Sequence, residues 1–271
     1  MSETAGAPAV VRLEGVTKTF PQGNVTALQD IDLELAPRQF VSLIGPSGCG
    51  KSTLLRLIGD LLEPTSGSLT VNGKTARQAR NDGDYGIVFQ DAVLFDWRSV
   101  AKNISLPLEM LGWERRRRRA RVEEMLELVE LAAFAEHHPW QLSGGMQQRV
   151  AIARALAFEP PLLLMDEPFG ALDEMTRERL NLELLSIWEK TGNTVVFVTH
   201  SISEAVFLSS RVVVMSPRPG RIAGTVDIDL PYPRTVETRD APRFFELVTG
   251  VRELLRSRGE HLLPEEEAVL E

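Results

Sequence analysis

The sequence predicts an α/β fold: a core with a parallel sheet covered by helices, an antiparallel β subdomain and an inserted helical subdomain. Three patterns support this prediction. Several short runs are wholly apolar, as in strands that are buried on both faces of a parallel sheet. These runs are residues 40–44, 162–165, 194–198 and 212–215. Apolar and polar residues alternate near the N-terminus, and apolar residues recur at helical spacing in the middle of the chain.

The N-terminal part predicts mainly antiparallel strands. Residues 1–8 are expected to be disordered. Alternation over residues 10–20 and 31–35 predicts two antiparallel strands, and the sequence PQGN at residues 21–24 predicts a turn between them. The apolar strand at residues 40–44 is followed by a glycine-rich loop and then by a short predicted helix.

Two further strands precede the helical part. Residues 66–73 predict a strand that is closed by an Asn-Gly turn, and residues 85–89 predict another short strand. From residue 100 to 158 the spacing becomes helical, so we expect a helical subdomain at about residues 95–160. Its apolar stripe comprises Met125, Leu126, Leu128, Val129 and Leu131. Two prolines at positions 160 and 161 are expected to end a helix over residues 147–157.

The domain plan is one domain over residues 9–224 and a short C-terminal extension over residues 225–271, with a solvated acidic tail at 265–267. The composition, 43% hydrophobic and 25% charged, is typical of a soluble globular protein. A net charge of −8 argues against a general nucleic-acid binder. A single cysteine excludes an internal disulfide and fits a reducing compartment. We expect neither a signal peptide nor a membrane span, so other chains would hold the protein at any membrane.

The glycine-rich loop after the strand at 40–44 fits the phosphate-binding pattern GxxxxGK[ST]. Its residues are Gly45, Pro46, Ser47, Gly48, Cys49, Gly50, Lys51, Ser52 and Thr53. A strand, a glycine loop and a helix N-terminus point several backbone N–H groups at one spot, where a polyphosphate is the natural ligand. The pattern therefore predicts a P-loop NTPase core. Lys51 would reach the β- and γ-phosphates, and the Ser52 hydroxyl would bind Mg²⁺; Cys49 is expected to be a small filler.

A second motif places two adjacent carboxylates at the end of the apolar strand 162–165. Asp166 is suited to hold Mg²⁺, mainly through water, because Mg²⁺ keeps several waters in protein sites. Glu167 would then orient an attacking water or accept its proton. The third motif is LSGGMQQR at residues 142–149. Ser143 can cap the following helix, while Gly144 and Gly145 leave that helix N-terminus bare for an anion. One nucleotide cannot easily use both helix ends of one chain, whereas two copies packed head to tail can.

With these three motifs in this order, residues 10–224 resemble the nucleotide-binding subunit of ATP-binding-cassette (ABC) transporters. The resemblance implies ATP hydrolysis with Mg²⁺ in a homodimer, with Lys51, Glu167 and His200 as the catalytic residues. It further implies that Phe20 stacks on adenine and that Gln90 senses Mg²⁺ and the membrane partner. Ser143 and Gly145 would touch the γ-phosphate across the dimer, Asp173 would lie at that interface, and His200 would contact the γ-phosphate.

Residues 94–97, 217–222 and 229–234 resemble one importer branch, the nitrate, sulfonate and taurine type, although Asp96 replaces the usual proline. This branch implies two integral-membrane permease subunits, an extracytoplasmic solute-binding protein, no nucleic acid and a peripheral position on the cytoplasmic face of the inner membrane. The solute is open among sulfonates, nitrate, taurine, pyrimidine vitamin precursors and flavins.

Alternatives remain at three points. A soluble ABC ATPase that is not coupled to transport, an inactive docking subunit and an exporter are the competing functions. Residues 93–97 and 106–111 either form the permease-docking patch or pack inside the helical subdomain. The run Arg115–Arg119 either meets anionic lipid headgroups or, as we favour, forms a solvated helix face.

Overall fold

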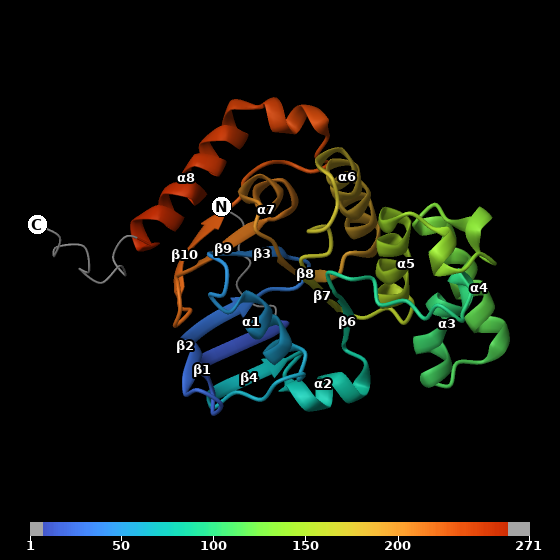
Figure 1. Ribbon diagram of the computed structural model, residues 1–271, viewed down its shortest axis with the longest axis horizontal. Helices are drawn as coiled ribbons and strands as arrows, with labels where there is room; N and C mark the ends of the chain where they lie inside the picture. The colour runs from blue at the N-terminus through green and yellow to red at the C-terminus, as the bar shows by residue number, and fades with distance from the viewer. Residues whose placement is uncertain (1–7, 260–271) are drawn as a thin grey trace, which may run out of the picture.

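A six-stranded sheet forms the centre of the computed structural model, which describes residues 8–259 of the 271-residue chain (Figure 1). Its strand order is β10-β9-β3-β8-β7-β6. The strands are β3 (Phe40–Ile44), β6 (Tyr85–Val88), β7 (Leu162–Asp166), β8 (Thr194–Val198), β9 (Arg211–Met215) and β10 (Ile222–Asp227). All neighbours pair in parallel except β10 and β9. The prediction of parallel strands at the apolar runs is therefore confirmed.

Strand β10 was not predicted, and it makes the sheet mixed rather than wholly parallel. It pairs antiparallel with β9, because only the short loop at residues 216–221 joins the two. Such a short connection permits only an antiparallel return, since a parallel partner needs a long crossover.

A separate four-stranded sheet, in the order β2-β1-β4-β5, forms the predicted antiparallel part. Its strands are β1 (Val11–Phe20), β2 (Val25–Leu35), β4 (Ser66–Val71) and β5 (Lys74–Thr75). Strand β2 begins six residues earlier than predicted, because Val25 pairs with Phe20 directly across the turn. The Asn-Gly turn is confirmed: Asn72 and Gly73 both have positive φ angles, 51° and 73°.

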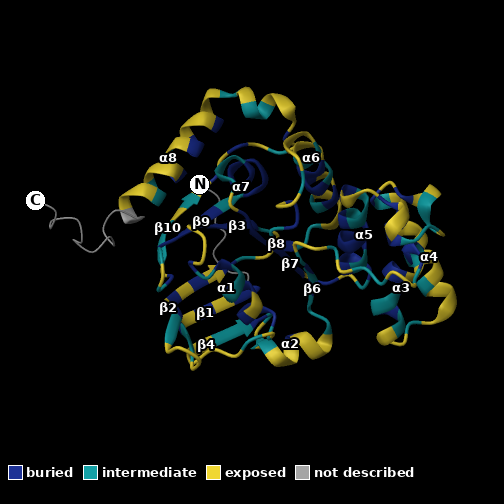
Figure 2. Cartoon of the chain, viewed as in Figure 1, coloured by how far each residue is buried: buried dark blue, intermediate teal, exposed yellow. Residues whose placement is uncertain are grey.

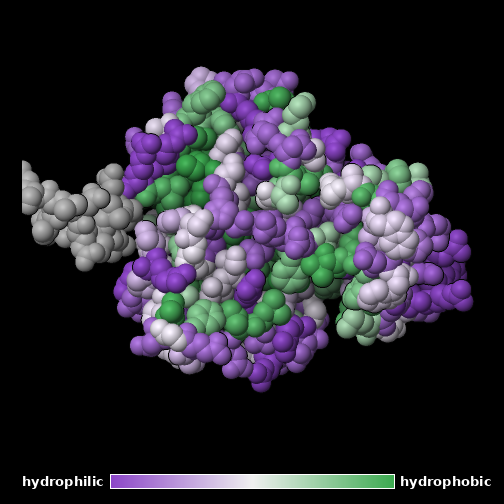
Figure 3. Space-filling model, in the orientation of Figure 1, coloured by the Kyte–Doolittle hydropathy of each residue, from purple (hydrophilic) through white to green (hydrophobic). Residues whose placement is uncertain are grey.

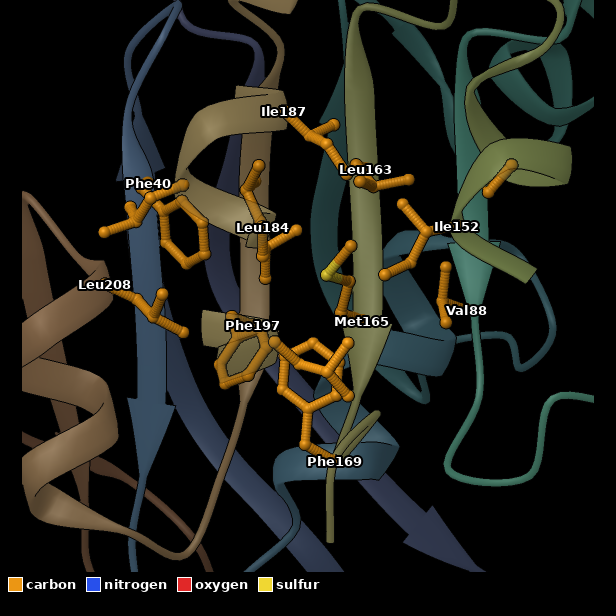
Figure 4. Close-up of a cluster of buried hydrophobic side chains, with 14 of the residues drawn as sticks. Phe40, Val88, Ile152, Leu163, Met165, Phe169, Leu184, Ile187, Phe197 and Leu208 are labelled. Carbon is orange, nitrogen blue, oxygen red and sulfur yellow. The ribbon is translucent and has the colours of Figure 1, made fainter. Parts of the chain in front are cut away.

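The two faces of the central sheet belong to two cores. On one face, alternate strand residues such as Phe40, Leu163 and Phe197 pack against the helices (Figure 4). On the other face, residues such as Val41 and Val196 pack against helix α1 (Lys51–Ile58) and the four-stranded sheet. Figure 2 shows the resulting burial, with the central strands dark and the outer elements largely exposed. The strands therefore hold their C-terminal ends, where the functional residues lie, on a rigid base.

The predicted helical part consists of α3 (Val100–Met110), α4 (Arg115–Leu128), two 3₁₀ turns (Ala132–Phe134 and Pro139–Gln141) and α5 (Gly144–Leu156). Of the predicted apolar stripe, all residues except the half-buried Leu128 are fully buried. Helix α5 begins at Gly144, three residues before the predicted start, because the Ser143 side chain caps it. In Figure 3 hydrophilic residues cover the outer end of this part, around α4.

Four helices had no predicted bounds: α2 (Ala76–Asp82), α6 (Glu174–Thr191), α7 (Ile202–Leu208) and α8 (Pro242–Gly259). A 3₁₀ turn at Val236–Asp240 precedes α8, so the described part of the C-terminal extension is largely helical and packs on α7 and β10. The expected disorder of residues 1–7 and the acidic tail at 265–267 lie outside the described residues. No helix of residues 8–259 is long and apolar enough to cross a bilayer.

Candidate nucleotide site

The loop between β3 and α1 has the geometry of a phosphate cradle. Gly48 and Gly50 have φ angles of 74° and 105°, a backbone region that residues other than glycine rarely adopt. Gly50 is the N-cap of α1 and supplies no side-chain cap, so no side chain claims the first N–H groups of this helix. A Cβ at Gly50 would also lie 2.6 Å from Leu28 Cδ2. The loop thus needs these glycines, and its helix end remains open to an anion.

Lys51 lies inside this loop with only 4% of its surface exposed. Its Nζ donates hydrogen bonds to the carbonyl oxygens of Gly45 (2.9 Å) and Pro46 (3.2 Å). Cys49 is buried beneath the loop, and burial raises the pKa of its thiol. A thiol without a thiolate is a poor nucleophile, so Cys49 acts as packing, in line with its expected role.

The two predicted carboxylates lie at the C-terminal end of β7, facing the cradle. The Ser52 hydroxyl donates a 2.7 Å hydrogen bond to Asp166 Oδ1, which joins the cradle to this strand. Glu167 has a φ of 50°, and its N–H donates to the Val198 carbonyl at the end of the neighbouring strand β8 (3.0 Å). This left-handed conformation is unusual for a residue with a side chain, and such residues cluster at functional sites.

Glu167 and His200 form a close pair. His200 Nε2 lies 2.6 Å from Glu167 Oε1, and the histidine follows β8 just as the glutamate follows β7. Because β7 and β8 are adjacent and parallel, their ends bring both side chains to the same edge of the sheet. A carboxylate beside an imidazole and a phosphate cradle can orient water for attack on a phosphoryl group.

One cleft of about 490 Å³ brings half of the predicted residues together. Its lining comprises Phe20, Gln22, Val25, Ala27, Ser47, Gly48, Gly50, Lys51, Ser52, Thr53, Glu167, His200 and Arg218. Gln90 lies in an adjoining cavity of about 270 Å³ that also reaches Glu167 and His200. Gly45, Pro46, Cys49 and Asp166 support the cleft without lining it.

The residues of the third motif do not line this cleft. Ser143 caps α5 by accepting a hydrogen bond from the Met146 N–H (3.3 Å). Gly144 and Gly145 pack against the start of α6. A Cβ on Gly144 would lie 3.4 Å from Leu172, and a Cβ on Gly145 would lie 3.4 Å from Thr176. Asp173 caps α6, and hydrogen bonds from Thr176 hold the pKa of its carboxyl below its usual value. The starts of α5 and α6 therefore form a second surface, apart from the nucleotide cleft of the same chain.

The site's oxygen ligands fit Mg²⁺. Among residues 8–259 no cluster of three histidine, cysteine or acidic side chains forms a metal cage. Mg²⁺ does not require one, since it is commonly held by one or two carboxylates together with phosphates and water. Ser52 Oγ and Asp166 Oδ1, already 2.7 Å apart, supply hard oxygen ligands beside the phosphate cradle.

The sequence did not predict a role for three residues in and around the site. Arg218 lines the cleft from the loop between β9 and β10. Gln148 donates to the carbonyl oxygens of Phe89 and Gln90, and so fixes the segment that carries Gln90. Glu204 is 5% exposed, and burial raises the pKa of its carboxyl. The proline and glycine around Arg218 were the only sequence signal for that residue, because they indicate a rigid loop.

Comparisons with known proteins show what this chain is similar to. The ABC transporter family matches residues 28–170. The chain is 48% identical to the taurine import ATP-binding protein TauB of Rhizobium johnstonii, over 86% of this chain and 90% of that protein. It is 50% identical to an uncharacterized ABC transporter ATP-binding protein of Methanocaldococcus jannaschii, over 83% and 84% of the two chains.

Solved structures show the same fold. The dimeric, post-hydrolysis structure of the ATP-binding cassette MJ0796 bound to ADP and Pi is 38% identical, with a TM-score of 0.71, and the match covers 82% of this chain and 100% of that one. The structure of cbiO1 from Clostridium perfringens, described as part of the ABC transporter complex cbiONQ, is 25% identical with a TM-score of 0.75 over 94% and 96% of the chains.

Proposed function

This chain belongs to the ABC transporter family and is an ATP-hydrolysing cassette, and from this premise we propose that it drives the import of a small sulfonate, with taurine as the first candidate. The observation that carries the solute class is the identity of 42–48% with taurine import ATP-binding proteins over 82–86% of the chain. The resemblance of residues 94–97, 217–222 and 229–234 to the same branch supports it.

Within the cleft, the roles follow from position. Lys51 and the N–H groups of the cradle would bind the phosphates, and Phe20 would stack on adenine. Ser52 and Asp166 would hold Mg²⁺, which offsets phosphate charge when bound. Glu167 would orient the attacking water and take its proton, and His200 would fix the γ-phosphate. The roles of Glu167 and His200 rest on their 2.6 Å contact and on their place beside the cradle in the same cleft.

Ser143 and Asp173 would act in a homodimer. Both cap helices on a surface apart from the cleft of their own chain, so a nucleotide bound at that cleft would meet them only from a second copy. A head-to-tail dimer would place the α5 N-terminus of each copy, with its Ser143 cap, over the phosphates of the other. Ser143 and Gly144 are exposed at that helix end, whereas Gly145, which was also predicted to contact the γ-phosphate, is buried against α6.

Two permease subunits would dock beside Gln90. Trp97 is 75% exposed and Met110 is 80% exposed, and Trp97 contacts Phe95 edge to face with ring centroids 4.9 Å apart. Leu108, by contrast, is fully buried, so part of the predicted patch packs inside the helical part. The Arg98–Glu109 ion pair (3.0 Å) joins the two segments that carry Trp97 and Met110, and exposed apolar side chains that gather on a surface mark interaction sites. The chain would then be peripheral on the cytoplasmic face, and a solute-binding protein would deliver the solute.

Replacing Glu167 by glutamine tests the hydrolytic site. The change keeps the side-chain shape and removes the proton acceptor, so hydrolysis should fall about 10²- to 10⁴-fold while ATP binding persists and a closed dimer accumulates. Glu34→Gln is the matched control, since Glu34 is exposed on β2 and, among residues 8–259, its ion pair is with Arg12 alone. Phosphate release and size-exclusion chromatography measure the outcome. Hydrolysis near the wild-type rate in E167Q would refute the assigned role.

The transport assignment has its own test. Where neighbouring genes encode a permease and a solute-binding protein, reconstitution with these partners should give ATP-dependent uptake of labelled taurine into vesicles. ATPase activity that responds to taurine supports the proposed solute. Activity that is indifferent to every such permease favours the alternative, a soluble ABC ATPase.

A further inference from the structure

The loop at residues 216–221, between β9 and β10, packs directly on the phosphate loop. Gly220 exchanges main-chain hydrogen bonds with β2: its N–H donates to the Ala27 carbonyl and its carbonyl accepts from the Gln29 N–H, both at 2.9 Å. A Cβ at Gly220 would lie 2.0 Å from the Cys49 carbonyl oxygen. The two loops therefore touch through their main chains, with no room for a side chain between them.

Internal hydrogen bonds fix the shape of this loop. Ser216 Oγ accepts from the Arg221 N–H (3.0 Å), and the Ser216 N–H donates to the Arg221 carbonyl (2.9 Å). Pro217 and Pro219 restrict the backbone on either side of Arg218. The direction of the Arg218 side chain is thus set by a rigid base.

Arg218 points into the nucleotide cleft and rests on the turn of the cradle. Its Nε and Nη2 donate to the Gly48 carbonyl at 3.3 and 3.2 Å, and the side chain lines the cleft together with Ser47 and Lys51. A guanidinium carries five N–H donors, so this anchor leaves several of them for a ligand.

The charge of Arg218 is unpaired within the part of the chain that the structure describes. No carboxylate there lies within 4.0 Å of its guanidinium, whereas Arg221, three residues later, pairs with Asp30 at 3.3 Å. A cation without a carboxylate partner, fixed at the edge of a phosphate cradle, complements a polyanion.

We propose that Arg218 binds the phosphate groups of ATP and is a nucleotide-binding residue supplied by the loop between β9 and β10. The inference rests on the assignment of the cleft to ATP under the proposed function. Arg218 is hydrogen-bonded to Gly48, in the middle of the phosphate cradle, so its guanidinium lies nearer the expected phosphates than the expected base. The base is expected beside Phe20, at the C-terminal end of β1.

Nucleotide affinity of Arg218→Gln tests the proposal. By isothermal titration of the full chain, the Kd for ATP should rise about three- to tenfold, the effect of losing one exposed charged contact. The Kd for GTP should rise by the same factor, because both nucleotides carry the same phosphates. The loss should shrink at high salt, which screens an exposed contact. Arg218→Lys, which keeps the charge, should recover most of the affinity.

Arg221→Gln is the control, because Arg221 is in the same loop and does not line the cleft; its Kd for ATP should match wild type. An unchanged Kd in R218Q overturns the proposal, even where the thermal stability falls, since that result describes a structural latch. A Kd that rises for ATP and not for GTP also overturns it in favour of a base contact. Wild-type protein that fails to bind ATP would overturn the proposed function itself.

Discussion

Gly220→Ala tests whether the loop at residues 216–221 supports the phosphate cradle. The new methyl group would lie 2.0 Å from the Cys49 carbonyl oxygen, whereas carbon and oxygen rarely approach within about 3.3 Å. The two main chains must separate by about 1 Å. This shift threatens two hydrogen bonds to β2, worth about 1 kcal/mol each, and adds about 1–3 kcal/mol of overpacking. We therefore expect the free energy of unfolding to fall by about 3–5 kcal/mol.

Urea unfolding followed by circular dichroism measures this loss, and the affinity for ATP should fall with it because Cys49 belongs to the cradle. Gly250→Ala is the matched control: a Cβ there meets nothing within 4 Å, and α8 should gain about 0.5–1 kcal/mol from the better helix former. A G220A protein with wild-type stability and wild-type ATP affinity would show that the contact between the two loops is not needed.

Three further variants probe the surrounding structure. Burial raises the pKa of Glu204 in the folded state, so ionising this carboxyl costs the wild-type protein stability as the pH rises above about 4.5. Glu204→Gln removes the ionisation and should stabilise the protein by an amount that grows with pH; urea titrations from pH 5 to 8 measure the difference. Arg234→Met should cost about 3–5 kcal/mol, because this buried guanidinium donates to four carbonyls around the end of α7; calorimetry will detect it. Ser143→Ala should cost about 1 kcal/mol through the lost α5 cap and should abolish ATP-dependent dimers in light scattering.

The sequence was sufficient where a residue's role depends on its near neighbours. The glycines at 48 and 50 predicted a cradle because their positive φ angles are a local requirement. The approach of Glu167 and His200 was also within reach, because each follows an apolar run and parallel strands end at one edge. Arg218 was not within reach, since it meets Gly48 across 170 positions and no periodicity says which loop docks on which.

The missed C-terminal elements have a related cause. Strand β10 has an intermediate burial pattern with no clean alternation, and it forms because β9 offers a free edge. Helix α8 packs its apolar side on α7 and β10, and those surfaces exist only in the folded chain. Propensity alone gives such segments weak signals, and tertiary contacts decide their structure.

The burial of Cys49 makes the protein its own reporter. Cys49 is the chain's single cysteine and is 1% exposed, and its Sγ lies beneath the cradle, 3.9 Å from Lys51 Nζ. A maleimide or a disulfide reagent can reach the buried thiol only when the cradle moves away from it. The rate of Cys49 alkylation therefore measures how often the cradle opens, without any engineered label. If ATP binding holds the cradle closed, alkylation should be slower in the presence of ATP.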